Sequence, residues 1–557
     1  MKIVFLFSSV LLCSAVPGYA MQRPSAEQIQ AYRADGSLQK RVEFAAEIGN
    51  NKFHPGAAAR LMYKLRVNSP AGAAVSAPPP AWRGMPTAGT PKIFALLVEF
   101  SDYPHAVANS STSVNTKIFG AGAGDYPYES LKSYYSRSSY GLLAIQGSTL
   151  GWYTAFAARS SISTTTAGRE NLIKEAINYF EAQGHDFAQY DNDGDGVIDY
   201  FAVIWAGPDN GWGNFWWGYQ TTFTDVAYTV DGKKLGDYSW QWESRPNAGT
   251  FWPLVLIHET GHALGLPDYY DYDPAVGPDG GVGGLDMMDS NIGDHNAFSK
   301  FMLGWLSPVN VPAGSISATL RQSDSYPDAV KVMPSSTAGG VFEEFFMLQN
   351  RVQSANDQNL PGSGIVIWHV DARLNGTGQN FLYDNSYTAH KLLRLMEADG
   401  LEEIENGDGN ADAGDFYVPL KEFNASSSPN SNKYDGSVTK VFAENIGGTT
   451  ASRTLDCGAM DTRRGYVTVM DNLFKPLVGG KCRLDVTTLS AGNITIKAYT
   501  LDGGLVRTIY NGPVNAGALR RFWDGKTDNG NIVASGLYLI HVKGPNTDEI
   551  EKVVVIK

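Results

Sequence analysis

Residues 258–268 read HETGHALGLPD, a stretch that sets two imidazoles, one carboxylate and a further acid close together. On a helix, His258 and His262 lie one turn apart on the same face, so both side chains can reach a single ion. Glu259 lies beside that face, where it can hold a water molecule and accept its proton. A buried helix with two incidental histidines explains the pattern poorly. We therefore expect His258 and His262 to bind zinc and Glu259 to act as the general base.

The third zinc ligand is less strictly fixed by this pattern. A catalytic zinc site has three protein ligands and a water molecule. Gly265 can adopt the positive φ that reverses the chain after the helix, and Asp268 follows His262 by six residues. We expect Asp268 to be the third ligand. His295, in SNIGDHNAF, is a rival donor, and a downstream Glu or no third protein ligand stay open as well.

The length and the N-terminus indicate an exported protein of several domains. The chain has 557 residues, which exceeds the size of one ordinary domain. Residues 1–20 combine Lys2, an apolar stretch and small residues before the expected cleavage point, which is typical of a signal peptide. Cys13 also suggests a lipoprotein, but Leu12 stands before it where a small residue is usual. No later run is long enough to span a bilayer, so we expect a secreted or cell-surface protein.

Charge and cysteine content narrow the range of partners. The net charge is −13 and no basic run occurs, which argues against nucleic acid or an anionic membrane as partner. We expect a monomer that acts on protein or peptide substrates.

Once the signal peptide is removed, Cys457 and Cys482 remain, 25 positions apart. In an exported chain such a pair favours a disulfide, with two free thiols as the alternative.

An N-terminal segment precedes the expected catalytic core. Residues 21–91 hold a polar, helix-prone stretch and then a linker rich in Ala, Pro and Gly. We interpret this segment as a propeptide and linker, with a plain spacer as the alternative. It contains no cysteine, so any latency must come from blocking the cleft or from another ligand. Buried strands are predicted at KIFALLVEFSD (Lys92–Asp102) and FAVIWAG (Phe201–Gly207), inside a catalytic domain at 92–310.

A calcium loop is predicted at 191–199, DNDGDGVID. Its expected donors are the side chains of Asp191, Asp193 and Asp195, the carbonyl of Val197 and the carboxylate of Asp199. Ala202 stands where an EF-hand loop has its bidentate Glu, so the site is weaker or is completed from elsewhere. A solvated acidic turn is the alternative. The acidic stretch at 405–415 lacks fixed spacing, and metal binding or a hydrated loop explains it equally well.

A methionine-containing turn, GGLDMMDS (Gly283–Ser290), follows the zinc motif. With this turn the chain resembles the metzincin clan of zinc peptidases, and more closely the immune inhibitor A family. The resemblance equates the family motif HExxHxxGxxD with residues 258–268 and the turn methionine with Met288. It covers most of 92–310, extends to EFFMLQNR (Glu344–Arg351), and implies a metzincin-like α+β domain. Gln349 stands where the family leads us to expect an acidic residue.

The remaining chain is predicted to be β-rich. We expect a β-rich domain at 311–456 and an Ig-like β-sandwich at 457–557, where short strands alternate with Gly and Asn turns. The stretch Trp523–Gly544 resembles the Ig-like domain of the flagellar hook-capping protein.

The motifs together predict a secreted zinc endopeptidase with one catalytic zinc and a structural calcium ion. In this hypothesis a zinc-bound water attacks the peptide carbonyl, with Glu259 as general base. The alternative is a non-catalytic exported binding or adhesion protein that retains a zinc site. Glu259 speaks against that alternative, because a structural zinc site needs no acid there.

Overall fold

The computed structural model describes residues 24–67, 84–121, 127–243, 249–273, 281–333, 341–386, 390–459, 466–488, 490–545 and 547–557. The expected signal peptide at 1–20 lies outside these residues, as does most of the expected linker. Within the described residues, no helix is long and apolar enough to cross a membrane.

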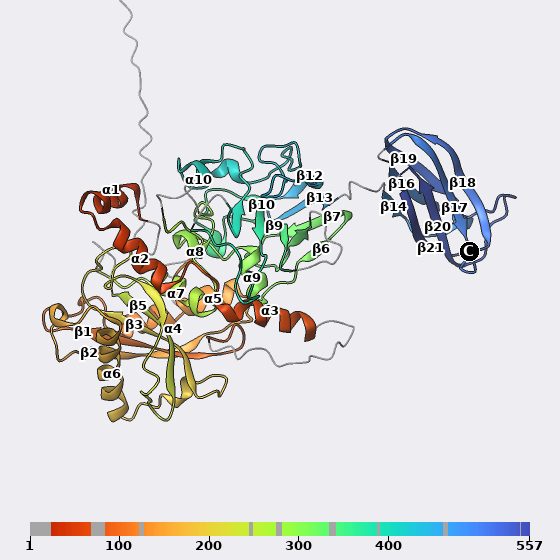
Figure 1. The fold of residues 1–557 in the computed structure, drawn as a ribbon. Helices are drawn as coiled ribbons and strands as arrows, with labels where there is room; N and C mark the ends of the chain where they lie inside the picture. The colour runs from red at the N-terminus through yellow and green to blue at the C-terminus, as the bar shows by residue number, and fades with distance from the viewer. Residues whose placement is uncertain are drawn as a thin grey trace, which may run out of the picture.

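Three helices open the described chain: α1 (Ala26–Ala34), α2 (Leu38–Ile48) and α3 (Pro55–Val67). α1 begins at a capping box in which the side chains of Ser25 and Gln28 each accept from the other residue's N–H. α2 ends at Gly49, whose φ of 83° is a left-handed conformation that glycine adopts without strain. The turn after Gly49 brings the chain to the region expected to be catalytic (Figure 1).

The region expected to be catalytic is built on a five-stranded sheet in the order β2-β1-β3-β5-β4. Its strands are β1 (Lys92–Glu99), β2 (Gln146–Thr154), β3 (Val197–Trp205), β4 (Tyr219–Thr222) and β5 (Lys234–Trp242). All neighbouring pairs are parallel except β4, which pairs antiparallel at one edge. A mostly parallel sheet of this kind requires cover on both faces.

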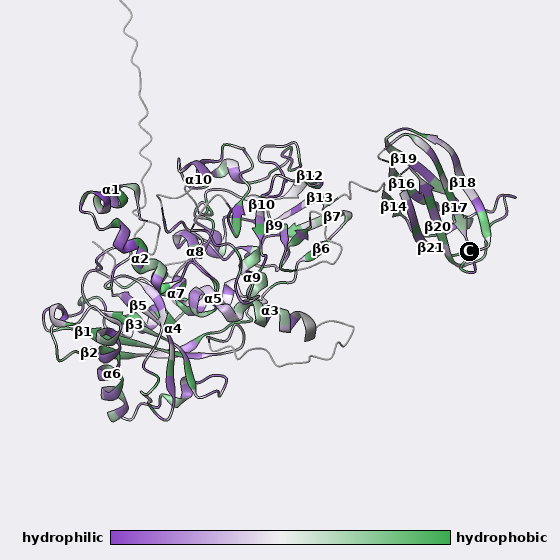
Figure 2. Ribbon diagram, viewed as in Figure 1, coloured by the Kyte–Doolittle hydropathy of each residue, from purple (hydrophilic) through white to green (hydrophobic). Residues whose placement is uncertain are grey.

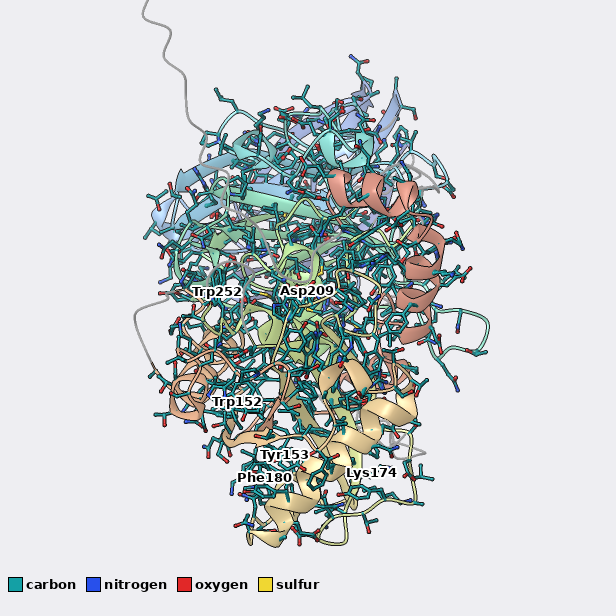
Figure 3. The ribbon with its side chains drawn as sticks, turned by 90° about the vertical axis from the view of Figure 1, so that its left-hand side faces the viewer. Trp152, Tyr153, Lys174, Phe180, Asp209 and Trp252 are labelled. Carbon is teal, nitrogen blue, oxygen red and sulfur yellow. The ribbon has the colours of Figure 1, made fainter. Side chains whose placement is uncertain are left out.

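Helices provide that cover. They are α4 (Ser111–Phe119), α5 (Leu131–Ser138), α6 (Thr166–Ala182) and α7 (Leu254–Ala263). β1 alternates between two cores: Ile93, Ala95 and Leu97 pack with residues of α5 and α7, and the intervening residues pack with α6. Figure 3 shows Lys174 and Phe180 of α6 at the end of the molecule farthest from the β-rich part. The region is thus α/β rather than the expected α+β, because its strands are mostly parallel and helices cover both faces of the sheet.

A β-rich part follows α8 (Met287–Ser290) and α9 (Ala297–Leu303). Its first sheet has the order β11-β10-β9-β8-β6, from β6 (Val309–Val311), β8 (Val330–Val332), β9 (Glu344–Arg351), β10 (Gly364–Asp371) and β11 (Leu393–Leu395). A second sheet joins β12 (Val441–Thr449), β13 (Ser452–Ala459) and β7 (Gly314–Arg321), and α10 is Glu403–Asn406. β9 and β10 carry both hydrophobic and hydrophilic residues (Figure 2), and their hydrophobic residues share a core with α7 and α9.

The C-terminal part is a sandwich of two sheets. One sheet is β14 (Tyr466–Met470), β16 (Cys482–Thr488) and β19 (Gly517–Trp523); the other is β15 (Leu473–Phe474), β21 (Thr547–Val555), β20 (Gly536–Gly544), β17 (Gly492–Tyr499) and β18 (Leu505–Val514). Both sheets contribute to one hydrophobic core.

Short 3-10 turns occur in all three parts of the fold: η1 (Arg159–Ser161), η2 (Ala188–Tyr190), η3 (Ala355–Asp357), η4 (Ala413–Asp415) and η5 (Pro476–Val478).

Two expectations about this part are corrected. Cys457 lies in β13, which pairs along its whole length with β7, so the boundary expected before Cys457 lies after Ala459. The expected Cys457–Cys482 disulfide is also wrong, because both thiols are free. They belong to two different hydrophobic cores, one in the β-rich part and one in the sandwich. Burial raises the pKa of each thiol to about 12.

Candidate metal centre

Helix α7 carries the two histidines of the motif and is buried along its whole length. The rings of His258 and His262 lie with their centroids 5.0 Å apart, one helical turn from each other. The helix ends in a Schellman motif: Leu266 N–H donates to the Gly261 carbonyl (2.9 Å) and Gly265 N–H to the His262 carbonyl (2.8 Å). Gly265 has a φ of 102°, so the chain reverses at this glycine.

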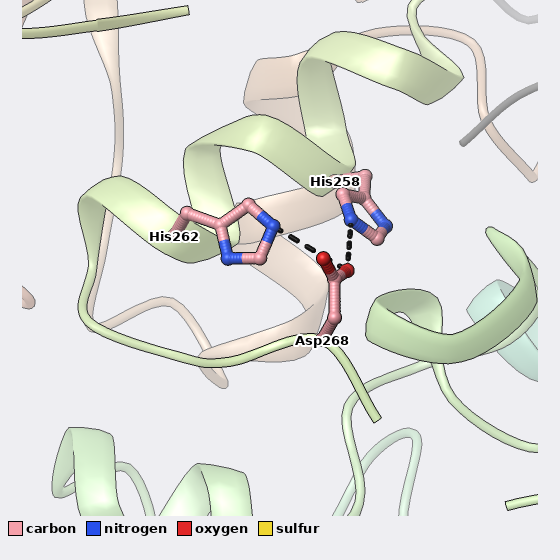
Figure 4. Close-up of side chains that lie close together, drawn as sticks. All are labelled: His258, His262 and Asp268. Carbon is pink, nitrogen blue, oxygen red and sulfur yellow. Dashed lines mark ion pairs between the residues drawn. The ribbon is translucent and has the colours of Figure 1, made fainter. Parts of the chain in front are cut away.

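The reversed chain brings Asp268 to both imidazoles (Figure 4). Asp268 Oδ1 lies 2.7 Å from His258 Nε2 and 3.4 Å from His262 Nε2. The other ring nitrogens face backbone carbonyls: His258 Nδ1 lies 2.9 Å from the Met287 oxygen, and His262 Nδ1 lies 2.9 Å from the Leu266 oxygen. A carbonyl can only accept, so each Nδ1 carries the proton and each Nε2 presents a lone pair.

This donor set fits a metal ion. Two imidazole lone pairs and a carboxylate oxygen converge at a buried point, and none of the three atoms has a hydrogen-bond partner in the described part of the chain. Without a cation, such an arrangement leaves buried acceptors facing one another, which is costly. Two nitrogens and one oxygen are the ligands that catalytic zinc takes from proteins, with a fourth position left open.

Glu259 completes the chemistry of the site. Its side chain is fully buried, and neither carboxylate oxygen has a hydrogen-bond partner among the residues that the structure describes. Burial raises the pKa of Glu259 to about 8, against the opposing effect of His258. Burial also acts to raise the pKa of Asp268, but the attraction of His262 and His258, when these are protonated, outweighs burial and holds that pKa well below its usual range. The site therefore combines an ionised carboxylate ligand, Asp268, with a second carboxyl group, that of Glu259, which is suited to exchange a proton.

Residues that the sequence reasoning did not single out support the third ligand. The Tyr272 hydroxyl donates to Asp268 Oδ2, and the Asp268 N–H donates to the Asn50 carbonyl (2.7 Å). Only the short separation of Tyr272 from Asp268 could have indicated the first contact. The second joins segments far apart in the chain. The first hydrogen bond orients the carboxylate, and the second holds the backbone of Asp268 in place.

Met288 lies directly against the zinc-motif helix. A Cβ placed on Gly261 would come 2.3 Å from the Met288 sulfur, so only glycine allows this approach. The Met288 carbonyl accepts from Tyr269 N–H (2.9 Å), and its N–H donates to Asp286 Oδ1 (2.7 Å). The methionine turn is therefore tied to both the helix and the chain that returns Asp268.

His295, the rival third ligand, lies elsewhere in the core. Its Nδ1 is 3.8 Å from Asp286 Oδ1, and its ring packs against Tyr134 with centroids 5.9 Å apart. The metal-binding group of His258 and His262 does not include it. Gln349, found where an acid was expected, is buried and accepts from the N–H of Ala297 (2.6 Å) and from Trp368 Nε1 (2.9 Å). Its role is thus to hold the start of α9.

The predicted calcium loop brings three of its donors together. Asp191, Asp193 and Asp195 each offer an oxygen within 4.8 Å of the others. Asp199 is not part of that group: its Oδ2 accepts from the N–H (2.9 Å) and the Nδ2 (2.8 Å) of Asn192. Lys233 Nζ lies 2.7 Å from Asp191 Oδ2 and neutralises part of the charge. The backbone of Val197 begins β3 at the end of this loop.

The N-terminal segment lies over the metal centre. Beyond the Asn50 contact with Asp268, the N–H of His54 donates to the Gly265 carbonyl (3.1 Å). With its amide oriented so that Nδ2 faces the Gln220 carbonyl, the Asn50 side chain donates to that carbonyl (3.1 Å) and accepts from the Gln220 N–H (3.2 Å) in edge strand β4. A side chain that pairs in this way occupies the edge where an extended peptide would add as a strand.

Comparison with known proteins supports these observations. Residues 81–294 match the immune inhibitor A peptidase M6 catalytic domain, and residues 478–548 match the FlgD Ig-like domain. Immune inhibitor A of Bacillus thuringiensis subsp. alesti is 26% identical over 230 residues, covering 33% of this chain and 34% of that protein. Pre-pro-metalloprotease PrtV of Vibrio cholerae serotype O1 (strain M66-2) is 25% identical over 236 residues, covering 33% of this chain and 25% of that protein.

The matched stretch spans about a third or less of the length of these curated relatives. Among solved structures, FLGD from P. aeruginosa is 21% identical and covers 16% of this chain and 63% of its own, with a TM-score of 0.12. Residues 81–294 therefore constitute a catalytic domain of the immune inhibitor A peptidase M6 family, and residues 478–548 a FlgD Ig-like domain.

Proposed function

We propose that this chain is a secreted zinc-dependent endopeptidase that hydrolyses peptide bonds in protein substrates. The observation that carries the proposal is the convergence of His258 Nε2, His262 Nε2 and Asp268 Oδ1 beside the unpaired carboxyl group of Glu259. The peptidase family match and the metalloprotease relatives support the same function. The contact of Met288 with Gly261 supports a metzincin-type arrangement.

The protonation state of each side chain at the metal centre indicates the role that we propose for it. His258, His262 and Asp268 would hold zinc, which supplies Lewis-acid activation of water and of the substrate carbonyl. Glu259 accepts the proton of the attacking water and delivers it to the leaving amine, so that the carboxyl group is regenerated. Its buried position keeps that proton from bulk solvent. The Met287 and Leu266 carbonyls keep both imidazoles in the ligating tautomer.

We also propose that residues 21–91 are a propeptide and linker that keep the enzyme latent. Asn50 pairs with β4, and its carbonyl accepts from Asp268 N–H, so the segment covers the edge of β4 beside the metal centre. Arg41 anchors it further, donating from Nη1 to the Trp212 carbonyl (2.5 Å). Cleavage in the linker would release the segment and open the edge of β4 to substrate.

The loop at 191–199 is proposed as a structural calcium site. The grouped oxygens of Asp191, Asp193 and Asp195 support it, and Val197 and Asp199 stay candidate donors from this loop.

The test of function uses the chain after removal of its N-terminal segment, with denatured casein as substrate. We expect cleavage that a chelator abolishes and added zinc restores. Glu259→Gln should retain zinc and lose about 10²–10⁴-fold in rate, because only the base is removed. Glu181→Gln, an exposed residue of α6, is the matched control. Casein left intact by the unsubstituted enzyme, or normal turnover by Glu259→Gln, would contradict the proposal.

A further inference from the structure

A second cluster of carboxylates lies in the β-rich part of the fold, apart from the metal centre. Glu397, Asp399, Glu403 and Asp415 each offer an oxygen within 4.8 Å of the others. They come from separate elements: Glu397 and Asp399 follow β11, Glu403 begins α10 and Asp415 ends η4. Their spacing in the chain is irregular, so only the folded structure brings these residues together.

The cluster contains buried oxygens without partners. Glu397 is 2% exposed and Asp415 is 1% exposed. One oxygen of each is satisfied, since Glu397 Oε2 accepts from Glu403 N–H (2.7 Å) and Asp415 Oδ2 from Asp412 N–H (2.8 Å). Among the residues that the structure describes, Glu397 Oε1, Asp415 Oδ1 and Glu403 Oε2 have no hydrogen-bond partner. Ionised carboxylates in this position repel one another unless a cation lies between them.

Neighbouring basic side chains do not supply that cation. Lys391 Nζ pairs with Glu405 Oε1 (2.7 Å) and Arg394 Nη2 with Glu402 Oε1 (3.0 Å). Lys421 Nζ donates to the Ala398 carbonyl (2.9 Å). In the part of the chain that the structure describes, no lysine or arginine forms an ion pair with the four clustered carboxylates.

We propose that Glu397, Asp399, Glu403 and Asp415 form a calcium site. All four donors are hard oxygens, with no histidine or cysteine among them, which disfavours zinc. Calcium takes six to eight oxygens in flexible geometry, so an irregular set drawn from three elements suits it better than magnesium, which demands a regular octahedron. A Cβ on Gly414 would lie 2.5 Å from Asp399 Oδ2, so glycine lets the backbone of η4 approach the cluster closely.

The proposed calcium site affects the metal centre because it stabilises a loop that contacts the methionine turn. The Ala411 N–H donates to the Gly283 carbonyl (3.0 Å), and Lys391 Nζ donates to the Gly281 carbonyl (3.1 Å). Gly281 and Gly283 lead directly into the turn that carries Met288. A calcium ion that holds α10 and η4 in place therefore stabilises the support beneath the zinc-motif helix. This inference does not depend on the proposed peptidase activity.

The test measures calcium binding and thermal stability in the full chain carrying Glu259→Gln, which prevents self-cleavage. The parent protein for all variants also carries Asp193→Asn and Asp195→Asn, which remove calcium binding by the 191–199 loop. After treatment with a chelating resin, calcium chloride is added, bound calcium is counted by equilibrium dialysis, and the Tm is recorded. The substitutions under test are Glu397→Gln with Asp415→Asn. Asp408→Asn, an exposed acid of the same segment, is the control.

We expect the parent and the control to bind calcium and to gain on the order of 3 °C in Tm. The double substitution should lose both effects, and its metal-free Tm should equal or exceed that of the parent because like charges are removed. Equal calcium binding by the double substitution and the control would overturn the proposal. Should the double substitution fail to fold, Asp399→Asn decides: calcium affinity weakened on the order of tenfold supports the site, and unchanged affinity refutes it.

Discussion

Asn50 offers a direct test of how the N-terminal segment restrains the enzyme. Asn50→Ala removes the two hydrogen bonds to Gln220 but leaves the backbone contact with Asp268. Each lost hydrogen bond contributes about 0.5–1.5 kcal/mol, so the segment should be held about 2 kcal/mol less tightly. That difference corresponds to a roughly 30-fold larger population of chains with an open cleft. Basal activity of the uncleaved chain should rise by the same factor.

The assay follows a quenched fluorescent peptide hydrolysed by the zinc-loaded chain, with mass spectrometry to show that the chain is intact. Gln39→Ala is the control, because the Gln39 side chain bonds only within α2, to Glu43. Its basal activity should match that of the unsubstituted chain. An intact Asn50→Ala chain no more active than this control would refute the idea that the segment blocks the cleft.

Further predictions concern stability and metal retention. Lys300→Met should destabilise the fold by about 3–5 kcal/mol in denaturant unfolding, because Lys300 Nζ lies 2.6 Å from buried Asp294, whose charge would lose its partner; an unchanged midpoint would count against this. Tyr272→Phe should weaken zinc affinity by about 10–100-fold in a competition with a chromogenic chelator, since Asp268 loses its orienting donor. Equal zinc retention would show that the hydroxyl has no such role.

The sequence correctly predicted those features of the structure that a few neighbouring residues determine. Helical spacing placed His258 and His262 on one face, and the glycine after them predicted the reversal found at Gly265. In such cases backbone geometry alone decides the outcome, because few residues take part.

Features that depend on long-range contacts could not be predicted. Cys457 and Cys482 look like a pair by spacing, but each thiol belongs to a different core. Asn50 is far from β4 in the chain, and nothing local indicates that it reaches that strand. The carboxylates around Glu397 converge only because β11, α10 and η4 fold together. Spacing rules do not describe contacts that the tertiary fold creates.

The zinc content of purified variants tests the central claim most directly. Elemental analysis after dialysis should find about one zinc ion per chain in the unsubstituted protein and in His295→Ala, because His295 lies apart from the ligand group. Asp268→Ala should lose the metal while keeping its fold by circular dichroism. Full zinc content in Asp268→Ala, or loss of zinc in a folded His295→Ala, would contradict the assignment.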